Sequence, residues 1–190
     1  MNAEAKTTNI NRRPVSTIIT VKTDDLSHME IILDAFYREA KDVANGTIYP
    51  DAKFDYAIKL ISASRRIGVN RSWYWSPAFT VDGMPADARV QLVYKPTYIA
   101  TAVLMNIYMG LNEIEQRRIS LPLKQAMTSC LGRSFEGHGY DAEDEIKEVL
   151  NIFQEFNAGD FIAKYPDFNK DFTTLYLSSI NSAAITKSKA

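Results

Sequence analysis

The segment from Pro96 to Asn112 places the strongest constraint on the fold, because it contains no charged residue. Its sequence is PTYIATAVLMNIYMGLN. A membrane span needs about 20 consecutive apolar residues, whereas this segment is shorter and includes Thr97, Asn106 and Gly110. We therefore predict a helix that is buried on most of its sides at the centre of a helical bundle. No contact with a membrane is expected.

Apolar residues recur at spacings of three and four along most of the chain, which is the pattern of amphipathic helices. Local signals set the expected helix boundaries. Asp51 is expected to cap a helix that Gly68 ends, and Pro96 is expected to separate a short helix before it from the uncharged helix after it. Asp167 or Asn169 is expected to start the last helix. The predicted helices span about 27–44, 51–67, 86–94, 96–112, 120–131 and 141–156, followed by a short helix near Gly159 and a last one that ends near Ser182.

A chain of 190 residues is typical of a single domain. We predict one all-α domain over residues 27–182, with about seven helices in antiparallel pairs around the central apolar helix. Residues 1–26 are expected to form a flexible or extended arm, and residues 183–190 a tail. Val15 to Lys22 is rich in β-branched residues, which favours an extended conformation. This arm either lies on the domain or pairs with the arm of another copy. The formation of a homo-oligomer is therefore one of two alternatives.

The charge balance disfavours a nucleic-acid or membrane surface, because 22 basic and 23 acidic residues leave a formal net charge of -1. Arg65-Arg66 and Arg117-Arg118 are therefore interpreted as solvated surfaces and not as a phosphate track. The single cysteine, Cys130, excludes an internal disulfide and lies on an apolar stripe, which predicts a small buried side chain. The polar N-terminus lacks the apolar core of a secretory signal, so a reducing, cytoplasmic location is expected.

The block GRSFEGHGYD, residues 132–141, holds the strongest functional signal. Three of its residues are glycines, which permit backbone angles that other residues resist or a close approach by another group. Beside the glycines lie a charge pair, Arg133 and Glu136, and two side chains that can transfer protons, His138 and Tyr140. In an enzyme, His138 would be the acid or base, Glu136 or Tyr140 its partner, and Arg133 an anion clamp.

Two glycine-rich motifs nearly match this block but lack their defining features. Gly132 and Gly137 have the spacing of a phosphate-binding loop without its lysine and hydroxyl. The dinucleotide-type spacing that begins at Gly137 follows a predicted helix and not a strand, and the acidic residues after it would repel a pyrophosphate. Asp141, which is expected to cap the next helix, is a further candidate ligand contact. The alternative for the whole block is a tight helix–helix connection.

Residues 68–85 form the second candidate, because a stretch of this length without clear periodicity is unusual inside a compact domain. Trp73 and Trp75 within it are candidates for stacking a sugar ring or a base. The alternative is that these aromatics form the underside of a loop that packs on the core. No cofactor is expected, and no metal site either, because His28 and His138 are far apart in the sequence and the only cysteine faces inward.

Four runs within residues 76–168 resemble the pattern of a bacterial family of small all-helical proteins. They are SPAFTVDG, YKPTYIATAVLM, GRSFEGHGYD and FIAKYPDF, of which GHGYD is the most specific part. No activity is established for that family, so the resemblance implies a helical fold and no catalytic role. Helices entered through proline or glycine loops also resemble one slice of an α/α toroid or helical-repeat fold.

We predict a soluble module that binds a small polar ligand or a protein partner through the 68–85 and 132–141 loops. The alternative is a hydrolase- or lyase-type enzyme that acts on a polar polymer or nucleotide, with His138 and Glu136 as the acid–base pair. A nucleic-acid-associated protein is disfavoured by the charge balance. If the enzyme prediction holds, the polar side chains of the block should converge with Trp73 or Trp75 on one concave pocket.

Overall fold

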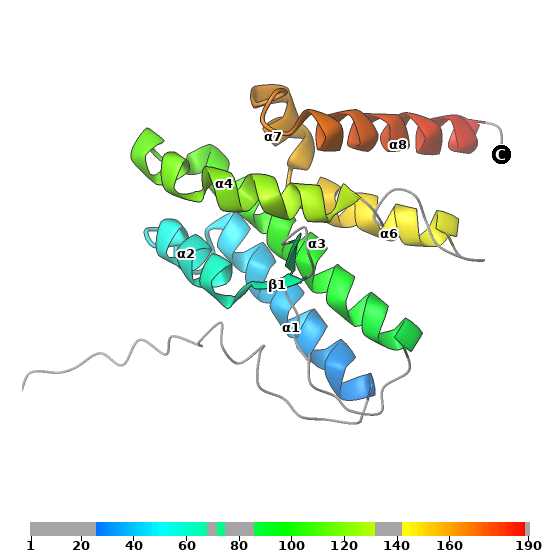
Figure 1. The fold of residues 1–190 in the computed structure, drawn as a ribbon, viewed down its shortest axis with the longest axis horizontal. Helices are drawn as coiled ribbons and strands as arrows, with labels where there is room; N and C mark the ends of the chain where they lie inside the picture. Colours follow the sequence, from blue (N-terminus) through cyan, green and yellow to red (C-terminus); the bar gives the residue numbers. More distant parts are fainter. Residues whose placement is uncertain (1–25, 68–71, 75–85, 132–141, 189–190) are drawn as a thin grey trace, which may run out of the picture.

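The computed structural model describes residues 26–67, 72–74, 86–131 and 142–188, and within these ranges the fold is all-α, as predicted. Seven helices and one short pair of strands make up this part of the chain (Figure 1). The helices are α1 (Leu26–Asn45), α2 (Lys53–Ala63), α3 (Ala86–Gly110), α4 (Glu113–Ser129), α6 (Ala142–Glu155), α7 (Ala158–Lys164) and α8 (Lys170–Ser188), and the strands are β1 (Arg65–Ile67) and β2 (Ser72–Tyr74). The expected arm, including Val15 to Lys22, lies outside the described residues.

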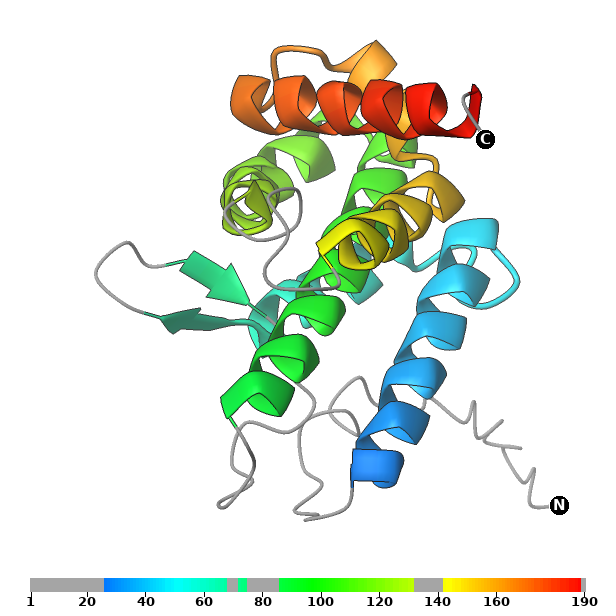
Figure 2. The same ribbon diagram turned by 90° about the vertical axis from the view of Figure 1, so that its right-hand side faces the viewer.

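The central position predicted for the uncharged segment is confirmed, because α3 packs against α1, α2, α4, α6 and α7. Its residues from Tyr98 to Met105 are fully or almost fully buried. Figure 2 shows α3 rising through the middle of the molecule, with α8 lying across one end of the bundle. Within the described ranges, no helix combines the length and apolar character needed to cross a membrane.

The two best-packed long helices, α1 and α3, lie side by side and run in the same direction (Figures 1 and 2). This arrangement differs from the predicted antiparallel pairing. The physical reason is the connection between them: α2, β1 and β2 intervene, so the chain returns to the starting end of the bundle before α3 begins. Antiparallel neighbours are typical only where the connection between two helices is short.

Pro96 lies inside α3, so the predicted break there is wrong. Pro122 lies inside α4, so the helix predicted to begin at about residue 120 begins earlier, at Glu113. A proline removes one backbone hydrogen bond and costs about 3 kcal/mol in a helix interior. Each buried leucine, isoleucine or methionine side chain of α3 contributes about 1.5–3 kcal/mol, so burial of several such residues outweighs the proline. The start of α4 at Glu113 is fixed by Asn112, whose Oδ1 accepts from the backbone N–H groups of Ile114 and Glu115 at 3.0 and 3.1 Å.

The boundaries of α2 also differ from the prediction. Ala52 occupies the position before the helix, and no side chain caps it there, so Asp51 is not the cap. The Lys53 side chain instead donates to the Ala44 carbonyl at 2.9 Å and ties the start of α2 to the last turn of α1. The helix ends at Ala63 and the chain becomes extended at Ser64, well before Gly68. Its buried face consists of Tyr56, Ala57 and Leu60, with Phe54, Ile58 and Ile61 at the edges.

The last helix starts where the sequence predicts, since the Asn169 Oδ1 accepts from the Phe172 backbone N–H at 3.2 Å. It continues to Ser188, past the predicted end near Ser182. Helices α7 and α8 cover one end of the bundle, where α8 contacts α4 and α6. This end is closed by rings from α3, α7 and the segment after α7: the Tyr108 ring lies 5.1 Å from Phe168 and 5.2 Å from Tyr165.

Candidate functional site

Most of the site predicted from the sequence lies outside the described residues, so the structure does not test its convergence. Trp73 is the exception, because its backbone belongs to β2. The other predicted site residues that fall outside are Trp75, Arg133, Glu136, His138, Tyr140 and Asp141.

Strand β2 is held in an antiparallel pair with β1, which places Trp73 in a defined register. Arg66 is directly opposite Trp73, and Arg65 is directly opposite Tyr74. The helical pattern of residues 51–67 predicts no such pair, because it continues the second helix through both arginines. The helix is interrupted at Ser64, whose ψ of 157° is extended and whose Oγ donates to the Ile61 carbonyl at 2.6 Å.

Helix α4 links the two predicted loops. Strand β2 packs against both α4 and α3, and the chain continues from Tyr74 directly into Trp75. The 132–141 block follows α4 in the chain, two residues after the C-cap Cys130. Helix α4 therefore leads into the 132–141 block and also packs against β2, the strand that lies within the predicted 68–85 loop.

The C-terminal half of α4 is held by a buried asparagine from the start of α8. Asn169 Nδ2 donates to the Lys124 carbonyl at 3.2 Å and to Thr128 Oγ1 at 3.0 Å. The same side chain caps α8 through its Oδ1. Buried polar groups must be hydrogen-bonded to avoid a desolvation penalty, so this residue fixes α8 and α4 relative to each other just before the block.

Cys130 is fully buried, as predicted, and it is the C-cap residue of α4. Its thiol donates to Thr101 Oγ1 of α3 at 3.4 Å. Burial raises the pKa of the Cys130 thiol to about 12, although the hydrogen bond to Thr101 acts in the opposite direction. The thiolate is the reactive form of cysteine, so Cys130 stabilises the helix and is not a nucleophile.

A charged cluster at the junction of α1 and α6 joins Glu155, Tyr37 and Lys41. The Glu155 carboxylate accepts a hydrogen bond from the Tyr37 hydroxyl and lies 3.1 Å from Lys41 Nζ. The hydrogen bond from Tyr37 and the charge of Lys41 lower the pKa of Glu155, while partial burial and the same carboxylate raise the pKa of Tyr37. The cluster therefore joins α1 to α6 through a hydrogen bond and an ion pair.

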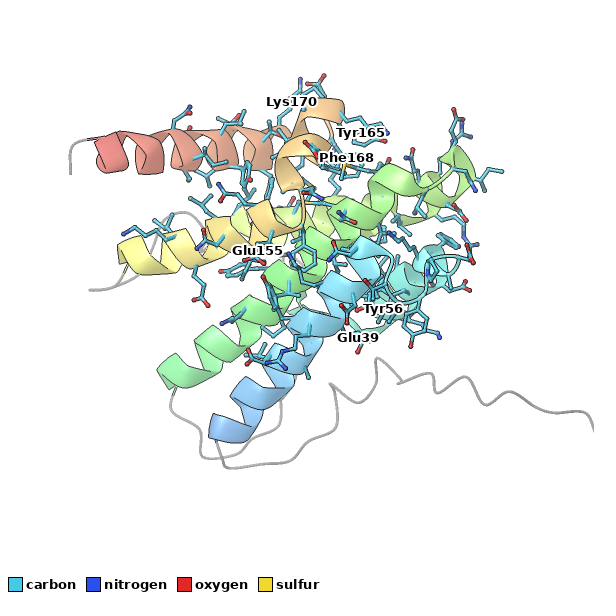
Figure 3. All side chains as sticks on the ribbon, turned by 180° about the vertical axis from the view of Figure 1, so that it is seen from behind. Glu39, Tyr56, Glu155, Tyr165, Phe168 and Lys170 are labelled. Atoms are coloured by element: carbon cyan, nitrogen blue, oxygen red, sulfur yellow. The ribbon has the colours of Figure 1, made fainter. Side chains whose placement is uncertain are left out.

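The junction of α1 and α2 contains a second polar group, the buried Tyr56 hydroxyl (Figure 3). Burial raises its pKa, and the nearby Glu39 carboxylate and Tyr49 add to the shift. The Tyr56 ring stacks on Tyr49, with ring centroids 6.3 Å apart. Neither this group nor Glu155 carries a local sequence signal, because each depends on a partner from another helix. Tyr37 and Glu155, for example, are 118 positions apart.

Side chains that could ligate a metal ion are placed only within the described ranges. Among those residues, no group of three or more His, Cys, Asp or Glu side chains is placed to hold a metal ion. Comparison with protein-family models, with curated proteins and with solved structures finds no match to this chain. The resemblance to a bacterial helical family therefore stays a prediction.

Proposed function

We propose that this chain is a binding module that takes a small polar ligand or a partner segment through its 68–85 and 132–141 loops. The observation that carries the proposal is the attachment of both loops to α4, through β2 and through the C-terminus of the helix. Recognition residues are commonly carried by loops on a rigid scaffold. The hydrogen bonds of Asn112 and Asn169 provide such rigidity along α4.

The polar clusters within the bundle support the same proposal. Glu155, Tyr37 and Lys41 are used to join α1 to α6, and the single thiol is buried. Ligand recognition is thereby left to the loops at α4. A reducing, cytoplasmic setting suits a chain whose one cysteine is kept as a buried thiol.

The experiment uses the fact that the chain has two tryptophans, Trp73 and Trp75, both in or beside the 68–85 loop. Tryptophan emission therefore reports on this region alone. We expect that at least one member of a library of nucleotides and oligosaccharides changes the emission and raises the Tm. A ligand at 100 times its Kd stabilises the folded state by about 2.7 kcal/mol.

The variant His138→Ala separates a binding block from a simple connection, with His28→Ala as the matched control. We expect His138→Ala to stay folded and to lose the ligand response, while His28→Ala retains it. A lower Tm with an unchanged response in His138→Ala would contradict the proposal, because the block would then only join two helices. Turnover of a ligand that disappears in His138→Ala while binding persists would favour the enzymatic alternative.

A further inference from the structure

Two large apolar side chains of α4 are exposed on one side of the helix. Ile114 is 74% and Leu121 is 64% exposed, and they are two of the three large apolar residues that are exposed in the described ranges. Residues seven positions apart lie about two turns apart, roughly 10 Å along a helix, on nearly the same side of it. Figure 1 shows α4 on the near side of the bundle, with no other helix in front of it. A single exposed apolar residue is ordinary on a protein surface, but two in line are spaced like the anchors of a helix contact.

Basic side chains lie between and beside these two residues. Arg117, Arg118 and Lys124 are all exposed. From Gln116 to Ser129 the helix contains these three basic residues and no acidic one, so its formal charge is +3 there, in a chain whose net charge is -1. The residues of this surface, which we call the α4 outer face, are Ile114, Arg117, Arg118, Leu121 and Lys124.

The charge of the α4 outer face is only partly neutralised by neighbouring residues. Arg117 lies 3.6 Å from Glu113, and the two side chains are 82% and 86% exposed. Ion pairs this exposed are weak, so Arg117 can exchange its partner for another carboxylate. The Arg118 guanidinium lies 5.1 Å from the centre of the Phe54 ring. Among the described residues, the ion pairs join no acid to Arg118 or to Lys124.

We propose that the α4 outer face binds an acidic amphipathic helix of a partner protein. Amphipathic helices dock through apolar anchors spaced three, four and seven positions apart. The complementary helix has apolar residues seven positions apart, which contact Ile114 and Leu121, and Asp or Glu between them, which pair with Arg117 and Arg118. These residues belong to neither loop of the proposed function, so the inference goes beyond that function and does not rest on it.

A second copy of this face is a poorer partner. If two α4 helices pair in antiparallel orientation around a two-fold axis, Ile114 meets Leu121 of the other copy. Arg117 and Arg118 then lie against the same two arginines of that copy, and a parallel pair also brings arginines together. Like charges that face each other across an interface cost binding energy. Charge therefore favours an acidic partner over self-association through α4.

Other segments of this chain match the face less well. Helix α6 is acidic at its start, but its apolar residues between Val149 and Phe153 are already buried in the core. The N-terminal 25 residues contain an apolar stretch, Val15–Val21, which is flanked by the basic Arg13 and Lys22. Neither segment combines free apolar anchors with negative charge beside them, which is the combination that the α4 outer face requires.

The first test measures binding of a model helix to the full chain by fluorescence anisotropy. The probe is a fluorescein-labelled peptide of three LAAEEAA heptads, in which a leucine recurs every seven positions with two glutamates between. The control peptide has lysine in place of each glutamate. We expect the acidic peptide to bind, and to bind more weakly as salt is raised. The lysine peptide should not bind.

The second test removes the apolar anchor. We expect Leu121→Gln to weaken binding of the acidic peptide about tenfold, because burial of one leucine contributes at least that much. The matched control is Leu177→Gln, which removes an exposed leucine from α8 and should leave binding unchanged. Both variants should keep the Tm of the wild type, since both side chains face solvent.

The third test removes one charge from the face. We expect Arg117→Gln to weaken binding of the acidic peptide by up to about fivefold, which is the range for an exposed ion pair, and to reduce its salt dependence. Arg38→Gln removes an exposed arginine from α1 and should bind the peptide as the wild type does. Equal losses in the two variants would overturn the inference, because binding would then follow total charge.

Further outcomes would overturn the inference and identify another occupant. A lower Tm of Leu121→Gln would show that another part of the same chain covers the face. A dimer that Leu121→Gln converts to a monomer in sedimentation experiments would assign the face to a second copy. Binding to phosphatidylserine vesicles without binding of the acidic peptide would assign it to a lipid surface. The tryptophan response to small ligands is a separate measurement, so the proposed function stands or fails independently of these results.

Discussion

Asn169 shows how much one side chain contributes to this structure. Its oxygen caps α8 and its nitrogen donates to two groups in the C-terminal half of α4, Lys124 O and Thr128 Oγ1. The residue is almost fully buried, so the loss of these bonds is not compensated by water. The start of the last helix and the position of the helix that leads into the 132–141 block thus depend on the same amide.

We expect Asn169→Ala to lower the free energy of unfolding by about 2–4 kcal/mol, since it removes a cap and both hydrogen bonds that join the start of α8 to α4. Asn169→Ser keeps a capping oxygen and should lose only part of this amount. Urea denaturation followed by circular dichroism measures both. If Asn169→Ala unfolds at the same urea concentration as the wild type, the linking role is wrong.

For single residues, the sequence predicts those roles that depend only on neighbouring positions in the chain. The Asn169 cap and the burial of Cys130 are both confirmed, because each follows from the residues on either side of it. Asp51 has the residue type of a cap but does not act as one, since Lys53 contacts the end of α1 instead. The contact of Glu155 with Tyr37 depends on how two distant helices pack, which no local pattern encodes.

Among the elements, α3 and α4 show where local rules are outweighed. The sequence predicts a break at Pro96 and a helix start near Pro122, yet both prolines lie inside continuous helices. In α3 the gain from burying a nearly continuous apolar segment exceeds the cost of the proline. The opposite happens in α2, where the helical pattern extends to Ile67 but the helix ends at Ala63. The strand pair that replaces its end requires β2 as a partner, which periodicity alone does not reveal.

A pair of leucine substitutions tests whether the buried face of α3 contributes more to stability than the outer face of α4. Leu104 of α3 is fully buried, whereas the side chain of Leu121, on the outer face of α4, is 64% exposed. We expect Leu104→Ala to lower the free energy of unfolding by about 2–5 kcal/mol and Leu121→Ala to change it by less than about 0.5 kcal/mol. Chemical denaturation of the two variants checks this. Equal effects would show that α3 is not the centre of the core.

Of the predicted site residues, Trp73 lies in the described strand pair, but its position directly opposite Arg66 was not predicted. The reason is geometric: cross-strand neighbours are set by register, and register is fixed by where the preceding helix stops. The remaining predicted site residues fall outside the described ranges, so their convergence stays a prediction.

For the whole molecule, the single cysteine provides a measure of global stability. Cys130 contacts α3 from the C-cap of α4, in the middle of the core, and the pKa of its thiol is raised to about 12 by burial. We expect an aromatic disulfide reagent to leave the native protein unlabelled over minutes and to label one thiol completely in 6 M guanidinium. Rapid labelling of the native protein would show that α3 and α4 separate without global unfolding.

The place of α3 in the chain order has a consequence for synthesis on the ribosome. Helices α1 and α2 are made first, but much of the surface that they bury belongs to α3, which is complete only at Gly110. More than half of the chain must therefore emerge before the first two helices can cover their apolar faces on this partner. During that interval the nascent chain presents Phe36 and Leu60 to its surroundings, which is the situation in which chaperones bind emerging proteins.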